Sequence, residues 1–174
     1  MSEDSLHDAL CALIGQASET SRSTADPVCR AQIRRWLEAM GDDNPAYLKE
    51  NRAPRAMLPV FTNRGLRETV AANDDISALT SAITGFGLFP AGVGIVHNYA
   101  ADIHVGDMVH ETTQVESVSP RKVTRLGAGY FITVRTSYAN QDGTDLGAQR
   151  ILVWPGSPGL RRKYRPCVRQ ANAV

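Results

Sequence analysis

The chain has 174 residues and a mass of 18.9 kDa, which corresponds to one ordinary globular domain. Hydrophobic residues make up 43% and charged residues 21%, which excludes wholesale disorder. The sequence contains no run of about 18 apolar residues of the kind that spans a membrane. The net charge of +1 conceals an asymmetry: residues 1–120 carry 9 basic and 16 acidic side chains, residues 121–174 carry 10 and 2. This split indicates a polyanionic ligand, a charge-complementary partner or a solvated basic tail.

The first part of the chain predicts two helices. Apolar side chains recur at helical spacing over residues 4–17, which indicates a short amphipathic helix, and the Ser/Thr-rich segment 18–25 is typical of a linker. Asp26 and Pro27 are a favoured N-cap and first-turn proline, so we expect a second helix to begin there. This helix has one apolar face and should end at Gly41.

The rest of the chain changes from helical to β character. Residues 55–72 predict a mostly buried helix, bent near Gly65, and residues 73–92 predict a long irregular connection. The later segments are rich in Val, Ile, Thr and Tyr, and Asn140-Gln-Asp-Gly143 is typical of a hairpin turn. We expect strands at 93–100, 107–118, 123–140 and 146–154. Helices followed by strands indicate an α+β fold in which a helix packs on an antiparallel sheet.

Cysteine and histidine positions bear on metal binding and on the cellular compartment. The chain has three cysteines: Cys11, Cys29 and Cys167. Their number is odd and they form no Cys-x-x-Cys pair, which excludes a disulfide framework and a cysteine zinc site. This use of cysteine favours a cytoplasmic location. Three histidines of the β-like region lack an evident third ligand on one face, so we interpret them as surface or loop residues and expect no metal: His97, His104 and His110.

The segment Trp36-Leu-Glu-Ala-Met-Gly-Asp-Asp-Asn-Pro-Ala-Tyr47 has the most specific pattern. It resembles the hydratase motif of the MaoC-like hot-dog proteins, the (R)-specific enoyl-CoA hydratases, in which a helix ends in Gly-Asp-x-Asn-Pro-x-His. Four positions match that motif, namely Gly41, Asp42, Asn44 and Pro45. Tyr47 stands at the position of the histidine.

Three longer segments resemble one branch of this family, the motif-degenerate MaoC-like subunit of heteromeric steroid side-chain enoyl-CoA hydratases: 26–36, 56–58 and 119–132. The resemblance implies an α+β hot-dog fold, an antiparallel sheet wrapped around a long central helix, here with an extra N-terminal helix. We therefore expect an N-terminal helix and linker over 1–25, a MaoC-like hot-dog domain over 26–156 and a basic flexible tail over 157–174. Relatives of this branch can carry a further C-terminal domain, and we expect any such function to reside on another polypeptide.

The resemblance also implies a chemistry, in which water adds across the double bond of an enoyl-CoA thioester and the Asp and His of the motif hold and deprotonate that water. Backbone amides at a helix N-terminus bind the thioester oxygen, which places substrate-binding residues near Ala56, Met57 and Pro59. A tyrosine has an unperturbed pKa of about 10 and donates a proton at neutral pH, so Tyr47 does not replace the histidine as a base. Loss of a positioned base costs on the order of 10²–10⁴ in rate.

The candidate catalytic residues are therefore Asp42 and Tyr47, each with a structural alternative. Asp42 and Asn44 also suit a helix-ending turn in any protein, and Tyr47 also suits a half-buried aromatic or a residue that lines the substrate pocket. Asn44 is a further substrate-binding candidate. Arg161 and Arg162 could meet the phosphates of coenzyme A, or belong to a solvated tail.

Three functions remain open at this point. The first is a subunit of a heteromeric enoyl-CoA hydratase that shapes the acyl pocket beside a second hot-dog subunit with the complete motif. The second is a self-sufficient, homodimeric hydratase or dehydratase on coenzyme A or carrier-protein thioesters that uses Asp42. The third is a non-catalytic thioester-binding module. In each case we expect an acyl- or enoyl-CoA ligand, no other cofactor, no nucleic acid and no membrane.

Overall fold

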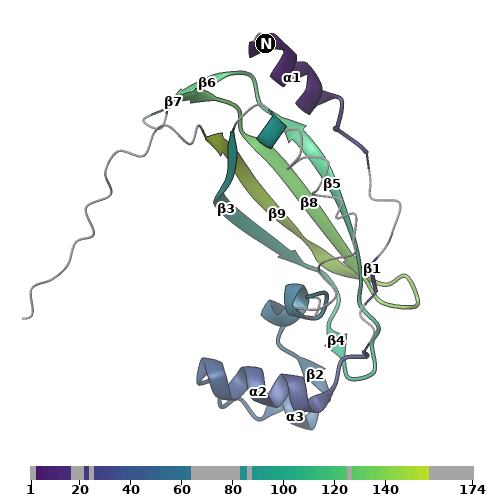
Figure 1. Cartoon of the computed structure of the whole chain (residues 1–174). Helices are drawn as coiled ribbons and strands as arrows, with labels where there is room; N and C mark the ends of the chain where they lie inside the picture. The colour runs from purple at the N-terminus through teal and green to yellow at the C-terminus, as the bar shows by residue number, and fades with distance from the viewer. Residues whose placement is uncertain are drawn as a thin grey trace, which may run out of the picture.

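The computed structural model describes residues 3–16, 22–23, 26–63, 83–85, 88–124 and 127–156. Within these residues the chain builds one five-stranded antiparallel sheet, seen in Figure 1 as the long twisted layer of the molecule. Its strands follow the order β1 (Arg22–Ser23), β5 (His110–Val118), β8 (Ile132–Ala139), β9 (Asp145–Gly156) and β3 (Phe89–Tyr99).

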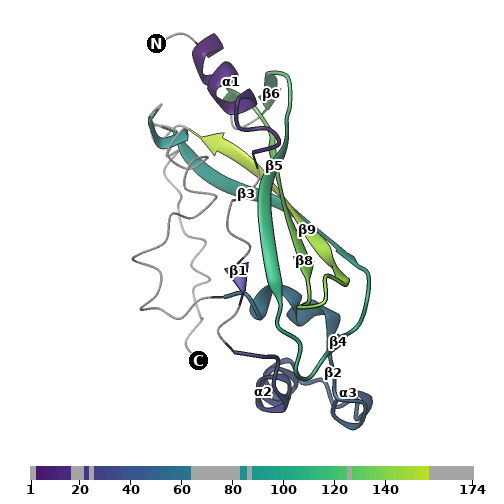
Figure 2. The same cartoon turned by 90° about the vertical axis from the view of Figure 1, so that its right-hand side faces the viewer.

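Short elements gather at the two ends of this sheet, and Figures 1 and 2 agree on their placement. One end carries α1 (Glu3–Cys11) and the small hairpin of β6 (Lys122–Thr124) with β7 (Gly127–Gly129). The other end carries a group of elements that holds the motif: α2 (Arg30–Met40), α3 (Ala46–Lys49), β2 (Arg52–Ala53), the 3₁₀ helix η1 (Arg55–Val60) and β4 (Ile103–His104).

The core divides in the same way. Alternate residues of β8 are buried, as expected for a strand with one face against a core: Ile132, Val134, Thr136 and Tyr138. At the α1 end, Leu6 and Leu10 pack against the apolar part of this face. At the motif end, Met57, Leu58 and Phe61 join the buried residues of α2 and β4 in a second cluster.

The expected second helix begins later than Asp26 and Pro27 predict. The amide of Val28 donates to the carbonyl of Asp107 at 2.9 Å, and the Gly106 amide donates to the Val28 carbonyl at 2.8 Å. These two bonds tie residue 28 to the loop between β4 and β5, and the N-cap Cys29 is extended, so the prediction of a start at Asp26 is wrong and α2 begins at Arg30. The expected end is confirmed, because Gly41 has left-handed backbone with φ 67°.

The expected long helix over 55–72 is a 3₁₀ helix in its described part. Pro54 precedes η1 and Pro59 lies inside it, and a proline removes an amide donor and clashes with a continuous α-helix, so the prediction of an α-helix from residue 55 is wrong for this turn. Residues 64–72, with most of the predicted central helix, lie outside the described residues.

Differences elsewhere are local. The first helix ends at Cys11, short of the expected residue 17, and Arg22 and Ser23 of the expected linker pair with β5. β3 begins at Phe89, inside the segment predicted as irregular, and the expected strand 123–140 comprises β6, β7 and β8. The hairpin turn is confirmed, because the Gly143 amide donates to the Asn140 carbonyl at 3.0 Å and the Asn140 amide donates to the Thr144 carbonyl at 3.1 Å.

Candidate functional site

The residues that match the hydratase motif form the end of α2 and the turn after it. The Gly41 amide donates to the Glu38 carbonyl at 3.4 Å, and the Asp42 amide donates to the Leu37 carbonyl at 3.0 Å. This pair of bonds is a Schellman termination of the helix, and it needs the left-handed backbone of Gly41. The first two motif positions therefore have a structural role in this chain.

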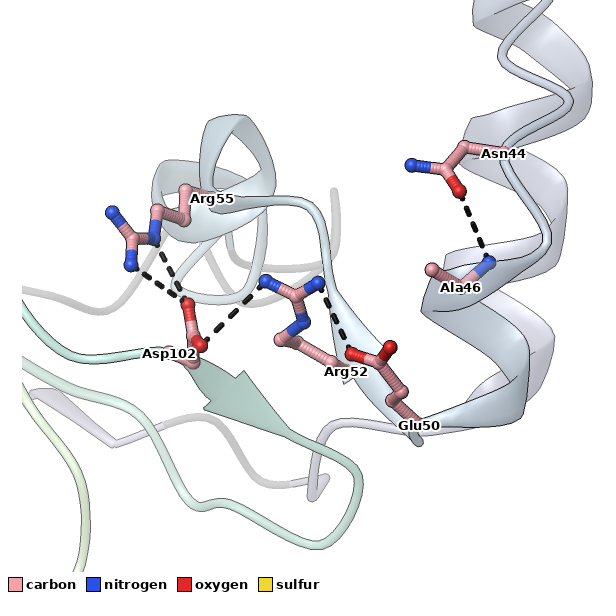
Figure 3. A network of polar contacts seen from close by, with 6 residues as sticks. All are labelled: Asn44, Ala46, Glu50, Arg52, Arg55 and Asp102. Carbon is pink, nitrogen blue, oxygen red and sulfur yellow. Dashed lines mark hydrogen bonds and ion pairs between the residues drawn. The ribbon is translucent and has the colours of Figure 1, made fainter.

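The polar side chains of the motif continue the turn. Asp42 Oδ1 accepts the Asn44 amide at 3.0 Å. Asn44 Oδ1 in turn accepts the Ala46 amide at 3.1 Å, a bond drawn in Figure 3, which opens α3. Asp42 is half-buried and Asn44 is exposed. Each side chain thus replaces a backbone partner in an Asx turn, which is the structural alternative that the sequence left open.

Tyr47, at the position of the family histidine, is pinned between the core and a cation. It is partly buried and packs against the motif-end cluster of apolar residues. The guanidinium carbon of Arg52 lies 5.6 Å from the centre of its ring, which is a cation–π arrangement. The Tyr47 ring is therefore held both by apolar packing and by Arg52, and the smaller imidazole of a histidine would make only part of these contacts.

Arg52 belongs to an ion-pair network that the sequence did not predict (Figure 3). Its Nη2 lies 3.1 Å from Glu50 Oε2, and its Nη1 lies 3.6 Å from Asp102 Oδ2. Asp102 Oδ1 also accepts the Nε and Nη2 of Arg55, at 3.0 and 2.9 Å. The hydrogen bond from Arg55 holds the pKa of the Asp102 carboxyl below its ordinary value, against the opposing effect of burial.

The expected thioester-binding residues lie on η1. Ala56 is exposed, Pro59 is partly buried and Met57 is 1% exposed. The Met57 amide donates to the Pro54 carbonyl at 2.9 Å, and Pro59 has no amide hydrogen. Of these three residues, only Ala56 is subject to neither limit as a donor to a thioester oxygen. Arg161 and Arg162 lie outside the described residues.

A second polar group that the sequence missed lies on the buried face of the sheet. The Tyr138 hydroxyl donates to Gln149 Oε1 at 3.4 Å, and the hydroxyls of Thr113 and Thr136 share a hydrogen bond of 3.0 Å. Burial, with the Glu111 carboxylate as the second cause, raises the pKa of the Tyr138 phenol, so this group stays protonated. Only the strand register could have signalled this polar group, because the alternation along β8 places Thr136 and Tyr138 on the same buried face as Ile132 and Val134.

The histidines of the β-like region are spread over separate elements. His97 is exposed on β3, where its ring stacks on Tyr99 at a centroid distance of 5.8 Å, while His104 lies on β4 and His110 on β5. Across the part of the chain that the structure describes, no three His, Cys, Asp or Glu side chains gather in a metal-binding group. Nor does any described helix have the length and apolarity to cross a membrane.

Comparison with curated proteins finds two informative relatives, although no family model matches the chain. A probable enoyl-CoA hydratase alpha subunit of Thermomonospora curvata is 33% identical over 164 residues, 86% of this chain and 51% of the relative. A 3-oxo-4,17-pregnadiene-20-carboxyl-CoA hydratase alpha subunit of Mycobacterium tuberculosis is 26% identical over 142 residues, 73% of this chain and 44% of the relative. The chain thus spans about half the length of these proteins.

Comparison with solved structures gives a match over nearly the whole length of both chains. A chain of the ChsH1–ChsH2 complex from Mycobacterium tuberculosis aligns with a TM-score of 0.79 and 22% identity, over 90% of this chain and 94% of the other. At that identity the likeness bears on the fold alone, and it confirms the expected α+β hot-dog fold.

Proposed function

This chain belongs to the MaoC-like hot-dog family, and we propose that it is one subunit of a heteromeric enoyl-CoA hydratase. In this assignment the enzyme adds water across the double bond of an enoyl-CoA thioester, this chain shapes the acyl pocket, and a second hot-dog subunit carries the complete motif. The observation that carries the proposal is Tyr47, a core-packed ring beneath the Arg52 guanidinium where the motif has a histidine. The names of both curated relatives, hydratase alpha subunits, support it.

The chemistry of hydration explains why position 47 carries the argument. Water must lose a proton as its oxygen bonds to the β-carbon, and the α-carbon must then gain one. A histidine both accepts and donates protons near neutral pH, whereas a phenol is a donor there. In our proposal Tyr47 lines the pocket, and Asp42 and Asn44 at most orient water or substrate beyond the turn that they build.

The edge strand β3 supports the proposed pairing with a second subunit. Among the residues that the structure describes it forms one edge of the sheet, and residues 89–99 contain no Lys, Arg, Asp or Glu. Three apolar side chains project from both of its faces with exposed fractions of 45%, 59% and 58%: Val93, Ile95 and Val96. Natural proteins protect bare edges with charges or short strands, so an edge this long and apolar favours a partner strand.

The substrate and setting follow from the same assignment. We propose a bulky acyl group, of which the steroid named for one relative is an example, and no cofactor beyond the coenzyme A of the substrate. Ala56, Met57 and Pro59 stay predictions for the thioester site, and Arg161 and Arg162 for the coenzyme A phosphates. The described cysteines, Cys11 and Cys29, are free thiols, which fits the cytoplasm in which we place the enzyme.

The test is hydration of a short and a steroid enoyl-CoA by the purified chain, alone and with a hot-dog subunit that carries Gly-Asp-x-Asn-Pro-x-His. We expect no turnover alone and turnover in the mixture. Turnover by the chain alone, abolished by Asp42→Asn, would instead establish a self-sufficient enzyme. Binding of an enoyl-CoA without turnover in either case would leave a thioester-binding module.

A further inference from the structure

Asp102 connects two segments that are separate along the chain. It lies just before β4, and its carboxylate reaches both Arg52 on β2 and Arg55 at the start of η1. Backbone pairing reinforces the connection, since Arg52 pairs with His104 and Ala53 with Ile103. One carboxylate therefore links the segment that contains β2 and the start of η1 to the residues just before β4.

Arg52 extends this connection to the motif. Its guanidinium covers the ring of Tyr47 at 5.6 Å while its Nη1 faces Asp102. The planar guanidinium pairs with Glu50 as well as with Asp102, so its position depends on where these two carboxylates hold it. Movement of Asp102 would change both the cover of Tyr47 and the start of η1.

We propose that Asp102 is a positioning residue, which sets Tyr47 and the first turn of η1 relative to each other and thereby the shape of the acyl-CoA site. The inference rests on the proposed function, which assigns both segments to substrate binding. Two arginines face two carboxylates, Glu50 and Asp102, so the network is balanced in charge and suits a clamp better than an anion-binding site.

The chain offers a matched control in Glu116. Its carboxylate accepts Nε and Nη2 of Arg150, at 2.7 and 2.9 Å, and its exposed fraction of 31% resembles the 33% of Asp102. Glu116 lies on β5 and Arg150 on β9, within the large sheet rather than among α3, β2 and η1. Loss of the Asp102 or of the Glu116 carboxylate removes a similar interaction with an arginine, but only the loss at Asp102 should alter the acyl-CoA site.

The experiment compares Asp102→Asn, Asp102→Glu and Glu116→Gln in the complex with the motif-complete subunit. We expect Asp102→Asn to raise KM for the enoyl-CoA about tenfold with kcat within about twofold, because this chain supplies binding rather than chemistry. Asp102→Glu should recover part of the loss, and Glu116→Gln should leave KM unchanged. An unchanged KM in Asp102→Asn, or an equal rise in Glu116→Gln, would overturn the proposal.

Hydrogen exchange separates this inference from the proposed function. Amide exchange over residues 55–60 should accelerate about tenfold in Asp102→Asn and stay at the wild-type rate in Glu116→Gln, whether or not the complex hydrates any substrate. If the wild-type complex is inactive, the proposed function fails, and the exchange of η1 still decides the clamp. Unaltered exchange in Asp102→Asn would refute it.

Discussion

Gly147 of β9 is a position where one added methyl group should distort the edge of the sheet. Its φ is +134°, and a Cβ placed there would lie 2.3 Å from the carbonyl oxygen of Asn98 on β3. Gly147 is paired with Tyr99 near the end of that strand, so the oxygen belongs to the backbone and has no rotamer through which to move away.

The cost of Gly147→Ala follows from two terms. A side chain in this region of φ costs about 1–3 kcal/mol, and a forced backbone shift costs a further amount of about 1–3 kcal/mol. We expect a loss of about 3 kcal/mol in the free energy of unfolding, which for a chain of this size lowers Tm by about 6–12 °C.

Thermal unfolding of the full chain, followed by circular dichroism, measures the effect against Gly94→Ala on β3. A Cβ at Gly94 would meet Leu152 at 3.8 Å, an ordinary contact, and that glycine has no positive φ, so we expect an unchanged or slightly higher Tm. A shift of less than about 2 °C in Gly147→Ala, or an equal loss in Gly94→Ala, would refute the reasoning.

Three further predictions address the motif, the edge and the sheet. Tyr47→His completes the hydratase motif and should give the chain alone measurable hydration, at least about tenfold above the uncatalysed background, whereas Tyr47→Phe should stay as inactive alone as wild type. Ile95→Lys, at a side chain 59% exposed, should raise the Kd for the partner subunit at least about tenfold in calorimetry while Tm stays within about 2 °C. Glu116 has a pKa below its ordinary 4.5, chiefly through the hydrogen bond from Arg150, so it stabilises the fold above that pH and loses the effect as pH falls through its folded value. Glu116→Gln should therefore lower Tm by a few degrees at pH 7, and the difference should shrink below about pH 4.5.

Local chemistry made part of the fold predictable. Gly41 and the Asn140–Gly143 turn were both located from residue type, because a left-handed helix end and a tight hairpin depend on the few residues beside them. The start of α2 differs from the prediction because a long-range contact decides it: backbone hydrogen bonds join Val28 to Gly106 and Asp107, far along the chain. A good N-cap sequence at Asp26 cannot compete with two backbone hydrogen bonds to the loop between β4 and β5.

The candidate site shows the same division. The motif residues were found because they are adjacent in sequence, whereas Asp102 was missed because nothing near it signals Arg52 or Arg55, about fifty residues earlier. The 3₁₀ form of η1 had a signal in Pro54 and Pro59, which the apolar pattern of 55–72 obscured. Tyr138 was visible only once strand register placed it on the buried face.

The motif itself separates folding from chemistry in this chain. Gly41 and Asp42 terminate α2, and Asn44 opens α3, so each contributes bonds that the fold needs whether or not water is activated nearby. Tyr47 lies inside α3, and the contacts that depend on its residue type are those of its ring with the apolar cluster and with Arg52. Our proposal assigns the base to the partner subunit, so residue 47 can change while Gly41, Asp42 and Asn44 persist for structural reasons. In our proposal, the residue at position 47 decides whether the chain itself carries the hydration chemistry.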